Sequence, residues 1–298
     1  MNKKILTVGA AVVIGGTLMI TSAFGAMSNT SAGYEAFKTA HKQAPKIDSL
    51  TTDAQFRITD GGQSLFDVQS KFKFNSNKTK GSGVINVTQN GETLTINGYI
   101  AQDQLVLKTS ENDTYYVMEH NADHVTKDDH ISFNPVIAEN AERIIDAVIG
   151  LNRNYFQLKE GPENSSVVKL SMHDNEIPLI VRTLGSILIK SVSKEKSGSA
   201  DLSIHPAFSQ MHAVKLPELT EDIQLNGIEF TTVINSEQFI EQYDILIQAS
   251  GKDAAGKQHE LELNFQLNFS DFNQTETDVL DLENKRVEKL EPDQLFEQ

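Results

Sequence analysis

The densest group of side chains that could do chemistry lies in residues 119–130, which read EHNADHVTKDDH. His120, His124 and His130 stand among carboxylates, and Zn²⁺ needs three or four such nitrogen or oxygen ligands converging at about 2 Å. Their spacing matches no established metal motif, and the segment joins an expected strand to an expected helix, where polar residues are usual. We therefore interpret it as a polar connector and predict no metal site.

No familiar catalytic signature accompanies this group. The Gly-x-Ser-x-Gly elbow of nucleophilic hydrolases is absent, and Ser82 lies in Gly81-Ser82-Gly83, which we interpret as a turn between strands. The His-Glu-x-x-His, Gly-x-Gly-x-x-Gly and phosphate-loop patterns are also missing. We expect a non-enzymatic protein with no catalytic residue and no cofactor. A hydrolase whose site forms only in the folded chain is left open as an alternative.

Oxygen ligands for Ca²⁺ are available at Asp271 and Asn273, but the Asp-x-Asp-x-Asp-Gly order of a calcium loop is not present. Asn and Asp side chains often bond their own backbone in turns. We expect residues 271–275 to form such a turn.

Charge and cysteine content exclude several classes of function. The formal net charge is −15, with no basic stripe, so nucleic acid is an unsuitable partner because phosphate contacts supply most of that affinity. The chain has no cysteine, which rules out disulfides, thiolate metal sites and a cysteine nucleophile. Attachment of lipid to an N-terminal cysteine is ruled out as well.

The N-terminus has the pattern of an export signal. Lys3 and Lys4 precede an apolar stretch over residues 5–20, and small residues, Ala23 and Gly25, come before the expected cleavage point. We predict a signal peptide over residues 1–25 and an extracytoplasmic location, either secreted or in the cell envelope. The alternative is an uncleaved membrane anchor, since residues 5–24 are close to spanning length.

Behind the signal, residues 33–44 predict a short amphipathic helix, because Tyr34, Phe37 and Ala40 recur near a 3.6-residue period. Alternation of apolar and polar residues then predicts an antiparallel meander of five or six strands over residues 50–119. Asp60-Gly61-Gly62 and Asn90-Gly91 supply hairpin turns for it.

The centre and the end of the chain differ in period. A helical middle is expected over residues 134–195, with helices at 134–150 and 175–193 and a short strand at 167–172 between them. Alternation returns in a second meander over residues 223–270. An acidic C-terminal tail follows over residues 283–298, preceded by a weak final strand at 279–282.

Each expected strand is apolar on one side only, which indicates a sheet with one buried and one wet face. The fold class is therefore α+β. We expect a curved antiparallel sheet, half-barrel-like, whose apolar face is covered by the central helices. The expected domain spans residues 32–282.

This order of elements resembles the envelope lipoprotein-carrier superfamily, the LolA- and LppX-like half-barrels. Residues 31–37 (SAGYEAF) and 259–263 (HELEL) support the resemblance. It implies a curved sheet lined by apolar side chains, closed by helices, that holds the acyl chains of a lipid. The missing cysteine departs from the lipid-anchored members of that superfamily.

The residues that would line such a ligand site follow from the apolar side of the strands and helices. Ordinary core packing of the same residues is the alternative interpretation. If the core is packed, the partner would be another envelope protein, bound through a sheet edge or the acidic tail. The predicted lining consists of Phe56, Phe66, Phe72, Phe74, Leu94, Ile96, Ile144, Val148, Leu184, Leu188, Leu263, Phe265 and Leu267.

Overall fold

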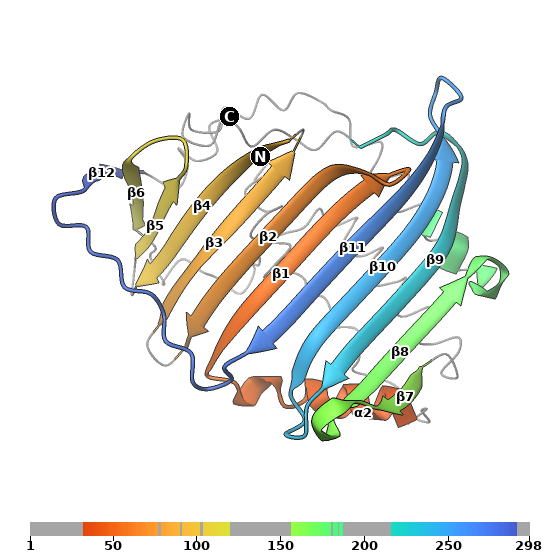
Figure 1. Cartoon of the computed structure of the whole chain (residues 1–298), viewed down its shortest axis with the longest axis horizontal. Coiled ribbons are helices and arrows are strands. Elements are labelled where there is room, and N and C mark those ends of the chain that lie inside the picture. Colours follow the sequence, from red (N-terminus) through yellow and green to blue (C-terminus); the bar gives the residue numbers. More distant parts are fainter. Residues whose placement is uncertain are drawn as a thin grey trace.

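Twelve strands form one continuous sheet in the computed structural model (Figure 1). The structure describes residues 32–76, 79–89, 91–101, 104–119, 156–179, 181–183, 185–186 and 216–290. The strand order is β12-β6-β5-β4-β3-β2-β1-β11-β10-β9-β8-β7. The strands are β1 (Ser49–Asp60), β2 (Gln63–Asn75), β3 (Lys80–Gln89), β4 (Glu92–Ala101), β5 (Gln104–Thr109), β6 (Thr114–Glu119), β7 (Gln157–Glu160), β8 (Ser166–His173), β9 (Glu221–Ile234), β10 (Ile240–Lys252), β11 (Gln258–Ser270) and β12 (Arg286–Lys289).

The first six strands form an antiparallel meander, as the alternation of apolar residues predicts. The β1–β2 turn uses Gly61 and Gly62, which have φ values of 54° and 79°. Gly91 has φ 83° in the β3–β4 turn. These left-handed conformations are open to glycine at little cost, so the predicted turns form where they are expected.

The two meanders join into one sheet through β1 and β11, which pair antiparallel from Thr51 opposite Ser270 to Asp60 opposite Leu261. β11, β10, β9 and β8 continue the antiparallel pattern on that side. The apolar side of each meander thereby becomes part of a single face.

The segment that follows β11 crosses the ends of the first strands as a strap, defined here as residues 271–285. Thr275 contacts Ser49 and Thr51, and Asp278 is bonded to Lys73 and Ser82. The strap leads to β12, which pairs with β6 in parallel, so the sheet is mixed rather than wholly antiparallel. The last described strand is β12 and not the predicted 279–282, because side-chain bonds at Asp278 hold the chain there without a ladder.

Residues 271–275 form the expected turn, with a different role for one side chain. The Gln274 N–H and the Thr275 hydroxyl donate to the Asp271 carbonyl oxygen. The Asn273 side chain does not bond its own turn: it accepts the Asp48 N–H at 2.7 Å and donates to the Lys46 carbonyl. The turn therefore docks the strap onto the start of β1.

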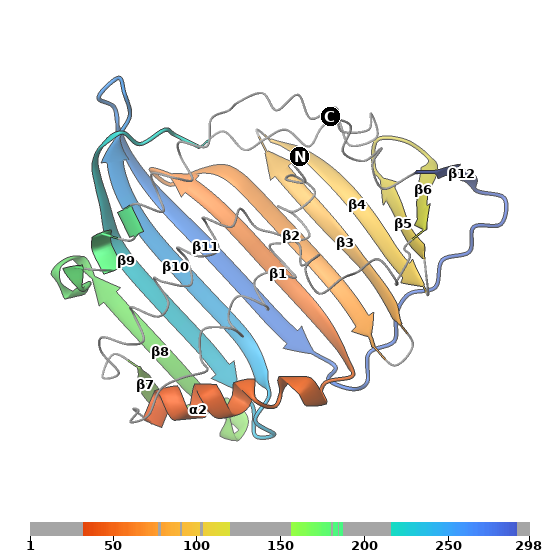
Figure 2. The same cartoon turned by 180° about the vertical axis from the view of Figure 1, so that it is seen from behind.

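One long helix is described, α2 (Ala32–His41), and a 3₁₀ turn at Ala44–Lys46 follows it. α2 lies across β7, β8 and β9 on one side of the sheet (Figure 2). The predicted helix at 134–150 lies outside the described residues, as does the end of the second; of the latter, residues 179, 181–183 and 185–186 are helical. Within the part of the chain that is described, no helix is long and apolar enough to cross a membrane.

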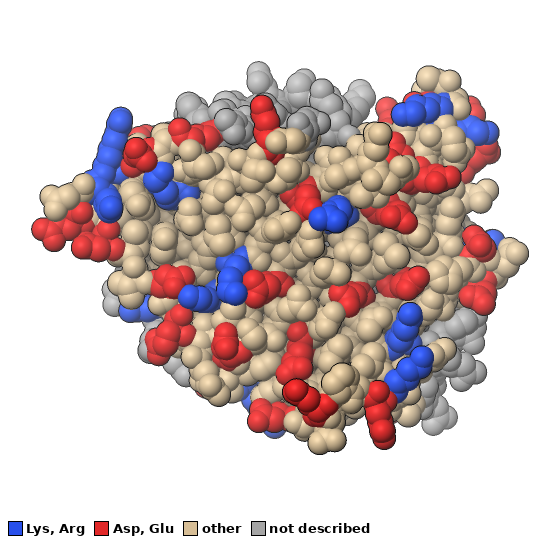
Figure 3. Space-filling model, in the orientation of Figure 1, with Lys and Arg blue, Asp and Glu red and all other residues tan. Residues whose placement is uncertain are grey.

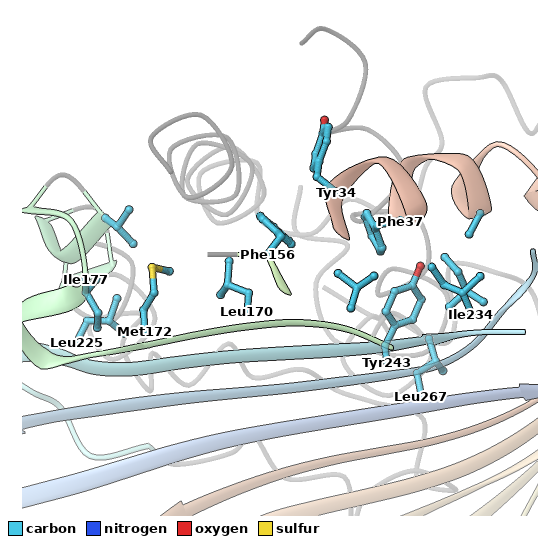
Figure 4. Close-up of a cluster of buried hydrophobic side chains, with 14 of the residues drawn as sticks. Tyr34, Phe37, Phe156, Leu170, Met172, Ile177, Leu225, Ile234, Tyr243 and Leu267 are labelled. Atoms are coloured by element: carbon cyan, nitrogen blue, oxygen red, sulfur yellow. The ribbon is translucent and has the colours of Figure 1, made fainter. Parts of the chain in front are cut away.

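The largest apolar cluster lies between α2 and the second meander (Figure 4). Phe37 is fully buried, and its ring centroid lies 5.5 Å from that of Phe230 and 6.2 Å from that of Tyr243. Tyr243 in turn packs beside Leu267 of the next strand. The helix thus covers the β7–β9 end of the apolar side.

Candidate ligand-binding face

The strand registers place the apolar side chains of nine strands on one side of the sheet, which we name the inner face. It is the side on which α2 lies (Figure 2). Its central row follows directly opposed residues from β10 to β5, and a second row runs beside it from β8 to β4. The central row is Tyr243, Leu267, Ala54, Ser70, Ile85, Ile96 and Thr109. The second row is Leu170, Phe230, Ile245, Phe265, Phe56, Val68, Val87 and Leu94.

All nine strand residues of the predicted lining lie on the inner face. Phe66, Leu94, Ile96 and Leu267 are buried, and Phe56, Phe72, Leu263 and Phe265 are partly buried. They are spread over three neighbouring apolar clusters rather than gathered at one point. The predicted helical residues Ile144, Val148, Leu184 and Leu188 lie outside the described residues.

One end of the inner face is open to solvent. Phe74, Gly81, Ile100 and Leu105 are opposed in register at the ends of β2 to β5. Phe74 is 46 % exposed and Ile100 is 43 % exposed. Gly81 has no side chain, so the row has no bulk between Phe74 and Ile100 and stays apolar there. An acyl chain can approach a surface of this kind.

Glycines on β3 and β4 shape this part of the face. A Cβ built on Gly83 would lie 2.2 Å from Cδ1 of Phe72, so the Phe72 ring occupies the space of the missing side chain. The prediction of a turn at Gly81-Ser82-Gly83 is wrong, since all three residues belong to β3. The glycines receive neighbouring apolar side chains, while Ser82 on the opposite side of the strand bonds Asp278 at 2.9 Å.

The other end of the face is polar. His259 is buried between two carboxylates: its Nδ1 lies 2.7 Å from Asp60 Oδ2 and its Nε2 lies 3.4 Å from Asp253 Oδ2. Asp60 Oδ1 also accepts the Glu260 N–H, and the backbone N–H of Lys257 holds the pKa of Asp253 below its usual value. These contacts tie the β1–β2 turn to the β10–β11 loop.

Between its two ends the inner face is uncharged in both described rows. Burial raises the pKa of Tyr243, which keeps its phenol neutral. Charged residues lie on the opposite, outer side, where Lys, Arg, Asp and Glu are scattered among other residues (Figure 3). Arg57 pairs with Asp67 at 2.6 Å there. The sheet therefore separates an apolar side from a hydrophilic one.

The described histidines do not form a hydrolytic relay. Ser171 Oγ lies 3.0 Å from His173 Nε2, and Glu229 lies 3.5 Å from the same nitrogen. A relay requires the nucleophile and the acid on opposite ring nitrogens. No group of three potential metal ligands occurs among the residues that the structure describes, while the predicted connector at 119–130 lies almost wholly outside them.

The predicted lining leaves out part of this face. Ile100 and Leu105 at the open end belong to strands whose alternation marks them as inner residues, so the signal was present. Ser70 and Thr109 belong to the same side by the same alternation, Ser70 between Val68 and Phe72 and Thr109 after Leu107. As polar residues they were left out of the predicted apolar lining. Both hydroxyls lie on the central row, and neither has a hydrogen-bond partner.

The fold and this face define an α+β protein built on one large, open, curved and mixed sheet. No protein-family model matches the chain, and no curated protein matches it. Solved structures with some likeness exist. One is an uncharacterised conserved protein from Thermus thermophilus, with 6 % identity, 87 % of this chain and 100 % of that chain covered, and a TM-score of 0.27.

Two further solved structures are similar at a lower level. A LolA superfamily protein from Nitrosomonas europaea has 8 % identity over 86 % of this chain and 97 % of its own, with a TM-score of 0.19. A β-barrel-like protein of a domain of unknown function from Brucella abortus has 9 % identity over 76 % of this chain and 99 % of its own, also with a TM-score of 0.19. Scores of this size assign no family.

Proposed function

We propose that this is a non-enzymatic, exported cell-envelope protein that binds a hydrophobic ligand, a lipid or its acyl chain, against the inner face of a LolA/LppX-like half-barrel. The observation that carries the proposal is the uncharged apolar face that crosses both meanders and reaches solvent at Phe74 and Ile100. Burial of each CH₂ group of an acyl chain contributes about 0.8 kcal/mol. A contiguous apolar surface that reaches solvent often marks a ligand groove or an interaction site.

Ordinary core packing is the competing explanation, and the open end separates the two. Side chains in a packed core are buried, whereas Phe74 and Ile100 remain nearly half exposed while the same row continues into buried residues. An entry point for a ligand combines the two: apolar side chains exposed at the surface and a continuous path from them into buried apolar residues. The polar end at Asp60 and His259 would close the opposite side of the site.

Native mass spectrometry of the protein purified from its own envelope, followed by organic extraction, tests the proposal. The wild type is expected to carry lipid. Phe74→Glu and Ile100→Glu place a charge at the open end, where partial exposure lets the fold tolerate it, and we expect both to lose the lipid. Val279→Glu is the matched control, because Val279 is an exposed apolar residue of the strap and follows Asp278, which bonds Lys73 and Ser82 on the outer side of the sheet. A bare mass with no uptake of added fatty acyl lipid would reject the function.

A second candidate function is recognition of an envelope protein through a sheet edge. Among the residues that the structure describes, β7 pairs only with β8, and its four residues are exposed, including Leu158. A free edge can accept a strand from another chain through backbone hydrogen bonds. In crosslinking experiments, Leu158→Lys would then remove a partner that the wild type captures, while its lipid content stays unchanged.

A further inference from the structure

Two buried hydroxyl groups on the inner face lack hydrogen-bond partners. They are Ser70 Oγ, in a residue 7 % exposed, and Thr109 Oγ1, in a residue 1 % exposed. A buried polar group without a partner costs about 1–3 kcal/mol. Folded proteins keep few of them, so each requires an explanation.

The surroundings of Ser70 are apolar on all four sides within the sheet. Ala54 and Ile85 are its direct neighbours on β1 and β3, and Val68 and Phe72 precede and follow it on the same side of β2. Ala54 and Ser70 are the short side chains in a region bounded by phenylalanines. The Ser70 hydroxyl is therefore an isolated polar point at the centre of the inner face.

We propose that Ser70 donates a hydrogen bond to the carbonyl oxygen of a neutral acyl ester bound on the inner face. The inference rests on the proposed function and specifies its ligand. A hydrocarbon chain offers no acceptor and would leave the hydroxyl unpaired. A free carboxylate would bring a charge into two rows that contain no cation, and an unpaired buried charge is costly. A neutral ester supplies the acceptor without that cost.

The strand registers give a control at the other hydroxyl. Thr109 lies on the same row as Ser70, three strands away, which is about 14 Å at the usual strand spacing. Thr109→Val also removes an unpaired buried hydroxyl and preserves the side-chain shape. Ser70→Ala removes the hydroxyl at the proposed contact.

The test compares two radiolabelled compounds of equal carbon count, methyl palmitate and heptadecane, by gel filtration with the purified protein. Ser70→Ala is expected to weaken binding of methyl palmitate about five- to tenfold, the effect of one hydrogen bond. Heptadecane should bind wild type and Ser70→Ala alike, and Thr109→Val should keep the wild-type ratio of ester binding to alkane binding.

Stability gives an independent readout. If Ser70 has no partner in the ligand-free protein, Ser70→Ala unfolds at an equal or higher urea concentration than the wild type, because an unpaired group is removed. A lower midpoint would assign Ser70 a structural bond and overturn the inference.

The remaining outcomes are distinct. Equal binding of the ester by wild type and Ser70→Ala, or parallel losses for ester and alkane, would overturn the role of Ser70 and leave the proposed function standing. If Ser70→Ala and Thr109→Val lose equal amounts of ester binding, the effect is not a contact at Ser70, and the inference is overturned. Failure of the wild type to bind either compound would reject both proposals.

Discussion

Phe72 fills the place of a side chain at Gly83. A Cβ on Gly83 would lie 2.2 Å from Phe72 Cδ1 and 2.7 Å from the backbone oxygen of Lys71, both shorter than real contacts. The ring end could move, but the backbone oxygen belongs to the paired strand β2 and cannot move without disturbing the ladder. This strand pair therefore depends on glycine at position 83.

Gly83→Ala is expected to destabilise the protein by about 1–3 kcal/mol, as overpacking of a buried site does. Urea unfolding measures the change. Gly98→Ala is the matched control on β4, where an added Cβ would meet only Leu107 Cδ2 at 3.6 Å, an ordinary contact. Equal losses in the two variants would contradict the steric argument.

Leu267→Ala is expected to lower the free energy of unfolding by about 2–5 kcal/mol, because Leu267 is 0 % exposed and its removal leaves a cavity in the central row. Thermal or urea unfolding reports the loss. Val279→Ala, at a position 88 % exposed, should change stability by less than about 0.5 kcal/mol. A loss below about 1 kcal/mol at Leu267 would mean that the row is loosely packed.

We expect the strap to contribute less to the stability of the fold at acid pH. The hydrogen bond from Lys73, with a second from Ser82, holds the pKa of Asp278 below its unfolded value of 3.8. A depressed carboxyl pKa stabilises the fold above that value, and the contribution is lost as pH falls through the lower, folded value. We expect Asp278→Asn to cost less than about 1 kcal/mol near neutral pH, because the group is exposed, and progressively less as the pH falls below 3.8.

Urea midpoints of wild type and Asp278→Asn across this pH range measure the difference. The two curves should converge in acid. A constant offset at all pH values would show that the asparagine acts through packing and not through lost charge.

Asp60 and His259 are expected to be energetically coupled. Asp60→Ala leaves the buried ring without its 2.7 Å partner, so each single substitution should cost about 1–3 kcal/mol. In a double-mutant cycle with His259→Phe, the two losses should sum to more than the loss in the double variant. Strict additivity would mean that the contact contributes nothing to the link between the β1–β2 turn and the β10–β11 loop.

The inner face could be predicted from alternation alone, strand by strand. Phe265 and Leu267 alternate with Gln266 and Asn268, which assigns their side of β11 without knowledge of any partner. That Phe265 lies opposite Phe56 depends on which strands pair, and alternation contains no such information. Alternation also places Ser70 on this side of β2, between Val68 and Phe72. The predicted lining left it out because only apolar side chains were included.

The two edge strands were missed for a different physical reason. β7 and β12 have four exposed residues each, so neither shows the apolar side that marks a strand in the sequence. Backbone pairing with β8 and β6 forms them instead. Val279 and Leu282 looked more like a strand, yet Val279 is exposed and the chain around it is fixed by Asp278.

The pairing of β1 with β11 also sets the order in which this protein can fold. Asp60 and His259 are 199 positions apart in the chain, so the central ladder closes only after a very long loop has been brought together. Contacts of such separation slow folding. During synthesis the edge of β1 that pairs with β11 stays unpaired, with Phe56 uncovered, until residues 258–270 have been made. A chain that stops short of β11 would therefore retain an exposed edge prone to aggregation.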